Sequence, residues 1–214
     1  TSWITTLDKS GLQLWDPESC KLLDRLDQDF QLPVSFRGFA NDDRWLIIRY
    51  PLLHKTSVVS LDVCGQPNCS PSWRSAKDID GATETWLSPD GRWLTTGGHF
   101  TGLPSGEKSP LRLWDLWQDE LQPIELQCYA CKTDDIRTLE FSRNAKWLAA
   151  VDGSTAYLWH RDSDNSGYTF DGKLLSTEQQ EVMQGLLRFT DDERWLVIAG
   201  KSGRAWIWDL NSVV

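Results

Sequence analysis

The chain has 214 residues, with 22 basic and 31 acidic side chains, and its formal net charge at pH 7 is −9. This acidic balance argues against nucleic acid as a partner, because nucleic-acid recognition is normally built on a basic surface. No run of 18 apolar residues occurs and no signal peptide is visible, so the sequence predicts no membrane span and favours a cytoplasmic protein.

The chain repeats a pattern in which an apolar residue precedes a tryptophan by six positions, with a polar turn between them. In chain order the complete copies lie at residues 39–45, 87–93, 141–147 and 189–195, and a shortened first copy keeps Trp3. The run that begins at each tryptophan is short and apolar, which is typical of a strand. We therefore expect one strand to end at each apolar residue and the next strand to open at the tryptophan.

A second signature closes a third predicted strand in every unit. It reads Leu14-Trp15-Asp16 in the first unit and returns, with some substitutions, at residues 60–62, 113–115, 158–160 and 207–209. The tryptophans of the first pattern stand at positions 3, 45, 93, 147 and 195, which are 42 to 54 residues apart. A period in this range, with strand patterning inside each unit, indicates a propeller or a solenoid.

The polar turns explain why two strands meet at each copy. In Ser88-Pro89-Asp90-Gly91 the proline presets the backbone angle that a tight turn needs. The glycine accepts a positive φ at no steric cost, and the other copies use Asn- and Asp-rich versions of the same turn. Each unit therefore begins with two antiparallel strands joined by a short loop.

We interpret each unit as a four-stranded antiparallel sheet, with strands A to D in chain order. One such sheet cannot bury both of its faces alone, and radial stacking of several sheets gives a propeller. The predicted fold is all-β: a β-propeller of about five four-stranded blades, the first and last incomplete. The blades fall approximately at residues 1–28, 33–76, 82–128, 135–176 and 184–210 of a single domain.

The run Ser-Pro-Asp-Gly-Arg-Trp-Leu-Thr-Thr-Gly-Gly at residues 88–98, followed by Leu-Arg-Leu-Trp-Asp at 111–115, resembles the WD40-repeat family, and the resemblance extends over nearly the whole chain. Two features of that family are missing. Lys77, Cys131 and Gln179 stand near its usual histidine position, and Asp152 is the nearest candidate for its turn aspartate. We therefore expect tryptophan packing to replace part of the family's hydrogen-bonded network.

The first unit begins at strand B and the last stops after strand C, so the sequence predicts a piece of a longer propeller. The repeats resemble bacterial ones, which often follow signalling domains in long chains, and this resemblance implies an upstream signalling domain.

Two kinds of metal site were considered. The pairs Cys64/Cys69 and Cys128/Cys131 could supply four zinc ligands, but the predicted topology places them on opposite faces, so free thiols are expected. Asp162, Asp164 and Ser166 match the opening of a calcium loop, although Lys173 stands where the closing glutamate belongs. They are a weak calcium candidate, a polar loop explains them more simply, and no cofactor is expected.

No nucleophile with an evident base occurs, so the chain is predicted to be non-catalytic. We expect an interaction scaffold or sensor module that binds a protein or peptide. The alternative is a propeller enzyme or small-ligand sensor with a site at the central channel. The predicted contact residues lie in the B–C loops of blades 2 and 3, where aromatic and arginine side chains favour binding: Arg49, Tyr50, His54, His99 and Phe100.

Overall fold

The computed structural model describes the strands and many of the tight turns. The described residues are 4–8, 11–26, 35–39, 45–50, 55–62, 72–80, 84–97, 111–118, 120–126, 136, 138–151, 155–162, 164, 166–176, 186–200 and 203–212. The chain divides into two compact units, Thr1–Gly81 and Ala82–Val214.

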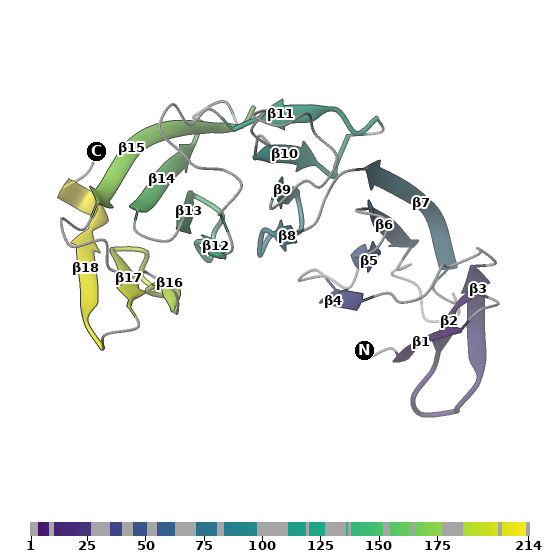
Figure 1. The fold of residues 1–214 in the computed structure, drawn as a ribbon. Helices are drawn as coiled ribbons and strands as arrows, with labels where there is room; N and C mark the ends of the chain where they lie inside the picture. The colour runs from purple at the N-terminus through teal and green to yellow at the C-terminus, as the bar shows by residue number, and fades with distance from the viewer. Residues whose placement is uncertain are drawn as a thin grey trace. The chain divides into compact units, whose positions relative to one another are not determined.

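Unit 1 contains two antiparallel sheets, drawn in purple and blue in Figure 1. Sheet 1 has three strands: β1 (Ile4–Asp8), β2 (Gly11–Trp15) and β3 (Leu22–Leu26). Sheet 2 has four: β4 (Ser35–Phe39), β5 (Trp45–Tyr50), β6 (Lys55–Asp62) and β7 (Ser72–Asp80). The two sheets share a core that includes Leu12, Leu14, Leu46 and Ile48.

Unit 2 contains three antiparallel sheets. Sheet 3 is formed by β8 (Glu84–Leu87), β9 (Trp93–Gly97), β10 (Arg112–Asp115) and β11 (Pro123–Glu125). Sheet 4 is formed by β12 (Thr138–Phe141), β13 (Trp147–Val151), β14 (Thr155–Arg161) and β15 (Tyr168–Ser176). Sheet 5 is formed by β16 (Leu187–Phe189), β17 (Trp195–Ala199) and β18 (Ala205–Asp209), followed by a single 3-10 turn at Leu210–Ser212.

The strand boundaries confirm the predicted pattern. Strands β4, β8, β12 and β16 each end at the apolar residue, and β5, β9, β13 and β17 each open at the tryptophan. The fold is all-β, with four-stranded antiparallel sheets and no α-helix among the described residues. In that part of the chain there is also no helix of the length and apolarity that crossing a membrane requires.

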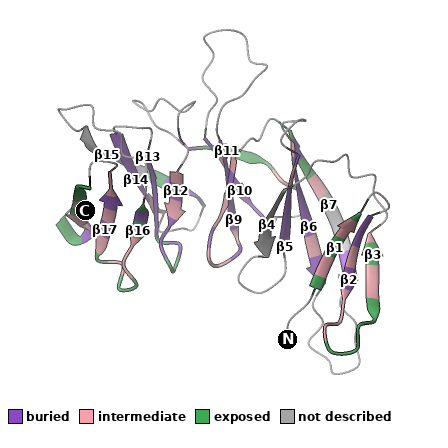
Figure 2. Ribbon diagram, turned by 60° about the horizontal axis from the view of Figure 1, so that its bottom comes forward, coloured by how far each residue is buried: buried purple, intermediate pink, exposed green. Residues whose placement is uncertain are grey.

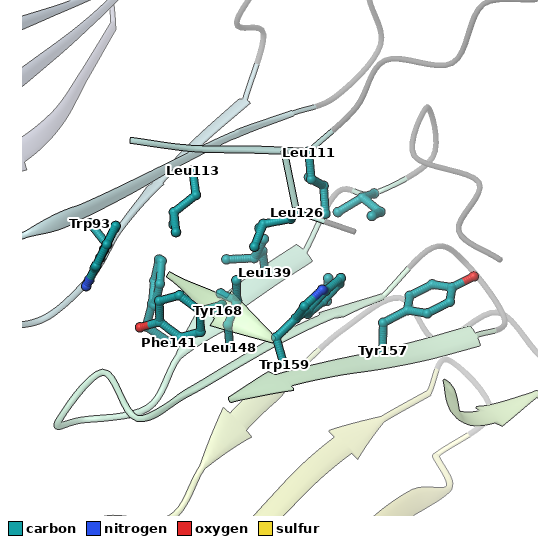
Figure 3. Packing of buried hydrophobic residues seen from close by; sticks show 12 residues of the cluster. Trp93, Leu111, Leu113, Leu126, Leu139, Phe141, Leu148, Tyr157, Trp159 and Tyr168 are labelled. Atoms are coloured by element: carbon teal, nitrogen blue, oxygen red, sulfur yellow. The ribbon is translucent and has the colours of Figure 1, made fainter. Parts of the chain in front are cut away.

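Large side chains fill the space between sheets 3 and 4. Trp93, Leu111 and Leu113 from sheet 3 meet Phe141 and Trp159 from sheet 4, as Figure 3 shows. Trp93, Leu111, Leu113 and Trp159 have no exposed surface at all. An aromatic ring buries about 150–250 Å², so tryptophan is the main packing unit of this interface.

The same positions are used again between sheets 4 and 5. Trp147, Ala149 and Leu158 turn one face of sheet 4 toward Leu196 and Ile198 of sheet 5. Figure 2 shows the resulting pattern, in which β13 and β14 are buried while the turns at the strand ends are exposed. Sheet 4 is therefore covered on both faces.

The tryptophan of strand C makes a polar contact in two of the sheets. In sheet 3 the Trp114 indole N–H donates to the Thr96 hydroxyl at 2.9 Å, and in sheet 1 Trp15 donates to Thr6 at 2.8 Å. In sheets 4 and 5 the residues that correspond to Thr96 are Ala150 and Ile198, which carry no hydroxyl. This particular hydrogen bond therefore cannot form in those two sheets.

Candidate functional site

The best-defined functional surface is one end of the sheets of unit 2, which we call the turn end. It comprises the A–B turns at residues 88–92, 142–146 and 190–194 and the described residues at and after the end of strand C, at 115–118, 120–122, 160–162, 164, 166–167 and 209–212. A meander of antiparallel strands brings A–B and C–D connections to the same end of a sheet, with the B–C connection at the opposite end. Side chains from different sheets can therefore meet here.

Each A–B turn has the same backbone form. A side-chain oxygen at the first turn position accepts from the tryptophan N–H: Ser88 from Trp93 at 2.8 Å and Ser142 from Trp147 at 3.0 Å. The fourth position has a positive φ in all three turns: Gly91 at 70°, Ala145 at 55° and Glu193 at 56°. This conformation favours glycine, so only sheet 3 carries the residue that suits it best.

An arginine–aspartate ion pair connects the A–B turn with the end of strand C in sheets 3 and 5. In sheet 3 the Arg92 side chain donates to both oxygens of Asp115, with the shortest distance 2.8 Å. In sheet 5 Arg194 pairs with Asp209 at 3.1 Å and is more exposed. Lys146 and His160 take these positions in sheet 4, where both pack on Trp147 instead, at 5.2 and 6.1 Å from the ring.

Charge effects at the first of these pairs follow from its partial burial. Burial alone would raise the pKa of Asp115, but hydrogen bonds from Arg92, from the Trp117 N–H and from Gln118 outweigh it, so the pKa is lowered. Hydrogen bonding to Asp115 in turn raises the pKa of Arg92. Both groups therefore stay charged at neutral pH.

Trp117 lies beside this pair with 64% of its surface exposed. Its backbone N–H donates to Asp115 at 3.1 Å, and the Arg92 guanidinium lies 5.3 Å from its ring and 4.5 Å from the buried ring of Trp93. The exposed indole of Trp117 thus contacts the Arg92 side chain, which is itself held in place by Asp115. Sequence reasoning missed Trp117, although its place two residues after the Trp-Asp signature was visible.

Polar contacts also join neighbouring sheets at the turn end. The Arg161 guanidinium of sheet 4 lies 3.3 Å from the Asp90 carboxylate of sheet 3. The backbone N–H of Asn144 in sheet 4 donates to the Glu193 carboxylate of sheet 5 at 2.7 Å. These contacts fix the position of one turn relative to the next.

The calcium candidate lies in the β14–β15 connection. The Asp162 carboxylate accepts from the hydroxyls of Thr169 and Ser166, the second at 3.5 Å, and hydrogen bonds from Ser166 lower the pKa of Asp164. These side chains, with His160 and Arg161, line a shallow depression of about 480 Å³. The described residues contain no group of three or more His, Cys, Asp or Glu side chains that could hold a metal. The carboxylates of Asp162 and Asp164 thus accept hydrogen bonds from neighbouring residues of a polar turn.

A second charged pair lies on the A strands of sheets 4 and 5. Arg188 of β16 donates to Glu140 of β12 at 2.6 Å. Burial raises the pKa of Glu140, and the charge and hydrogen bond of Arg188 oppose that rise. The pair bridges two sheets along the strands that lie side by side in unit 2.

Of the predicted contact residues, Arg49 and Tyr50 lie in the described part of the chain, and His54, His99 and Phe100 lie outside it. Tyr50 is the last residue of β5 and is 4% exposed, packed in the core of unit 1 with the Lys55 ammonium 5.6 Å from its ring. Arg49, the preceding residue, is partly exposed. Both cysteine pairs considered for zinc also lie outside the described residues, whereas Cys20 is a free, exposed thiol.

No protein-family model matches the chain, and no curated protein matches its sequence. Solved β-propellers match its fold. Hsv2 of Kluyveromyces marxianus aligns with a TM-score of 0.62 and 12% identity, over 98% of this chain and 57% of Hsv2. The Cps50 (Swd1) β-propeller domain of Myceliophteria thermophila gives 0.54 and 10%, over 98% of this chain and 67% of that domain.

A 6-phosphogluconolactonase candidate from Bacteroides uniformis is similar to the same degree, with a TM-score of 0.54 and 13% identity, over 98% of this chain and 66% of that protein. The chain thus spans between just over half and two thirds of the length of these structures. At such low identity the likeness establishes the β-propeller fold and leaves activity open.

Proposed function

We propose that the chain is a WD40-type propeller that acts as a non-catalytic scaffold or sensor module for a protein or peptide partner, in the cytoplasm and next to an upstream signalling domain. The observation that carries the proposal is that charged side chains at the turn end form ion pairs within the fold. Arg92, Arg161 and Arg194 are each in an ion pair with an aspartate of the fold. Such groups make a rigid frame that displays loops, which suits recognition of a partner.

The contact surface of this proposal lies in the B–C connections. In unit 1 it includes Arg49 and His54, with the buried Tyr50 as support for the end of β5. In unit 2 it includes His99 and Phe100. Arginine and aromatic side chains are enriched among residues that dominate binding energy, because they bury much area at a low entropic cost.

Site-specific photo-crosslinking in the native host tests this function. A benzophenone side chain at position 54 or 100 should trap a discrete protein adduct that is identified by mass spectrometry and confirmed by the reciprocal crosslink. The same probe at position 124, on the outer strand β11, is the matched control because Ile124 lies outside the B–C connections and is 37% exposed. If positions 54 and 100 give no adduct beyond that of position 124, the scaffold proposal fails.

The second candidate is a propeller enzyme or a small-ligand sensor with a site at the central channel. One observation favours it: Glu140 combines burial with a raised pKa on an A strand, as acid and base groups of enzyme sites often do. Against it, Arg188 already pairs with this carboxylate at 2.6 Å. A thermal-shift screen with sugar phosphates would favour this candidate if a hit disappeared in Glu140→Gln and persisted in Glu84→Gln.

A further inference from the structure

Trp117 occupies a position at which the fold does not require tryptophan. In sheets 1, 3 and 5 the residue two places after the strand-C aspartate donates its backbone N–H to that aspartate: Glu18 to Asp16 at 3.0 Å, Trp117 to Asp115 at 3.1 Å and Asn211 to Asp209 at 3.1 Å. The turn is thus made by the backbone and the aspartate. The side chain at this position is free to serve another purpose, and Glu18 and Asn211 show that a polar one suffices for the turn.

The exposed indole is presented in a fixed orientation. Arg92 is held by Asp115 through two hydrogen-bonding nitrogens and lies between the rings of Trp93 and Trp117, at 4.5 and 5.3 Å. The charge of Arg92 is neutralised by Asp115, so it does not repel a cation that approaches Trp117. A ring fixed in this way loses little side-chain entropy when a partner binds to it.

The surroundings of Trp117 are acidic. Among the described residues of the turn end the acidic side chains are Asp90, Asp115, Glu120, Asp162, Asp164, Asp191, Asp192, Glu193 and Asp209, and the basic ones are Arg92, Arg143, Lys146, Arg161 and Arg194. Each of the four arginines is in an ion pair with an aspartate of this same set, at distances from 2.8 to 3.9 Å. The excess charge that faces solvent is therefore negative.

We propose that the turn end of unit 2, centred on Trp117, binds a basic peptide segment of a protein partner. A lysine or arginine side chain of the partner packs on the exposed face of the Trp117 indole, where the ring quadrupole attracts a cation. Carboxylates such as Glu120 and Asp164, which have no Arg or Lys ion-pair partner among the described residues, add a longer-range attraction that steers the segment to this end. The same charge disfavours nucleic acid and anionic lipid as partners.

Within unit 2 the turn end lies at the opposite end of the sheets from the B–C connections, so it is a second contact surface and does not depend on the one proposed above. The two can be tested separately. Loss of the photo-crosslinks at positions 54 and 100 would leave basic-peptide binding intact, and the reverse also holds.

The test uses fluorescein-labelled hexaarginine, with hexaglutamate as the charge control, and measures fluorescence anisotropy with the 214-residue chain at low and at physiological salt. Hexaarginine should bind, more weakly at higher salt, and hexaglutamate should not. Trp117→Asn, which installs the residue of sheet 5, should weaken hexaarginine binding about five-fold, in line with the strength of an exposed cation–π contact. Trp117→Phe should keep most of the affinity.

Leu186→Asn is the matched control, because it removes a large apolar side chain of similar exposure, 49%, that precedes strand A at the other end of sheet 5. It should bind hexaarginine as the parent does. Equal binding by Trp117→Asn and the parent would overturn the proposal, since hexaarginine would then be bound by non-specific attraction to the acidic surface alone. Absence of hexaarginine binding at low salt would overturn it as well. Unchanged melting temperatures for the variants show that a change in affinity is not a change in folding.

Discussion

Arg92 and Asp115 face each other across the β9–β10 pair, with the guanidinium Nε 3.1 Å from one carboxylate oxygen and Nη2 2.8 Å from the other. One residue precedes strand B and the other ends strand C. The pair thereby closes the end of the sheet at which both strands meet. Its side chains are only 16% and 10% exposed. Solvent and salt therefore screen this ion pair less than they screen ion pairs on the surface.

Asp115→Asn should therefore cost about 1.5–3 kcal/mol of unfolding free energy at pH 7, the range for hydrogen bonds to a charged group. The pKa of Asp115 is lowered in the folded chain, so its stabilisation is present above the unfolded value of about 3.9 and is lost as pH falls through the folded value. Denaturant titrations at pH 7 and pH 3 should show the gap between parent and variant shrinking in acid. Asp209→Asn, in the more exposed pair, should cost less than about 1 kcal/mol. A gap of equal size at both pH values would contradict this account.

The strand-B tryptophans are wedges between sheets. Trp93 has no exposed surface and Trp147 has 3%, so Trp93→Ala or Trp147→Ala should each cost about 3–5 kcal/mol. Trp117→Ala removes the same side chain from an exposed position and should change stability by less than about 0.5 kcal/mol. Thermal unfolding of the three variants distinguishes them. Equal melting temperatures for Trp93→Ala and Trp117→Ala would mean that the burial of a tryptophan does not determine how much stability its removal costs.

The fourth position of the A–B turns offers a reciprocal pair of substitutions. Ala145 has φ 55°, a left-handed conformation that costs a residue with a Cβ about 1–2 kcal/mol, and Gly91 has φ 70° at the equivalent place. Ala145→Gly should stabilise the chain by about 0.5–1 kcal/mol, because relief of strain exceeds the added freedom of the unfolded chain. Gly91→Ala should destabilise it by about 1 kcal/mol. Denaturant midpoints that move in the same direction for both variants would exclude strain as the cause.

Calcium should leave the melting temperature unchanged. Calcium takes six to eight oxygen ligands, whereas the Asp162 carboxylate is already engaged by Thr169 and Ser166. A ligand that binds only the folded state raises its stability by mass action. Scans in 5 mM calcium chloride and in EDTA should therefore overlay, and a rise in calcium that disappears in Asp162→Asn would reinstate the ion site.

The sequence was most informative where structure is decided locally. The residues that end strand A and open strand B could be predicted because a proline or glycine turn and the following apolar run act within a few residues, as at 88–97. The contact of Trp117 with Arg92 could not be predicted, because the arginine reaches the ring from a different turn. Tyr50 illustrates the same limit: the sequence pattern places it in a B–C loop, but β5 is one residue longer than β9 and carries it into the core.

The described strands pair only with strands that are adjacent to them in the chain. No other strand therefore intervenes in the chain between two paired strands, and proteins rich in local pairings fold faster than those dominated by distant ones. Folding of repeat proteins can start at any unit and spread to its neighbours. During synthesis the A–B hairpin at residues 84–97 can form before the strands of the next sheet have left the ribosome. Until the neighbouring sheet has been synthesised, the sheet faces that carry the tryptophans remain exposed to solvent. On a slowly translated chain these faces are the surfaces most prone to aggregation.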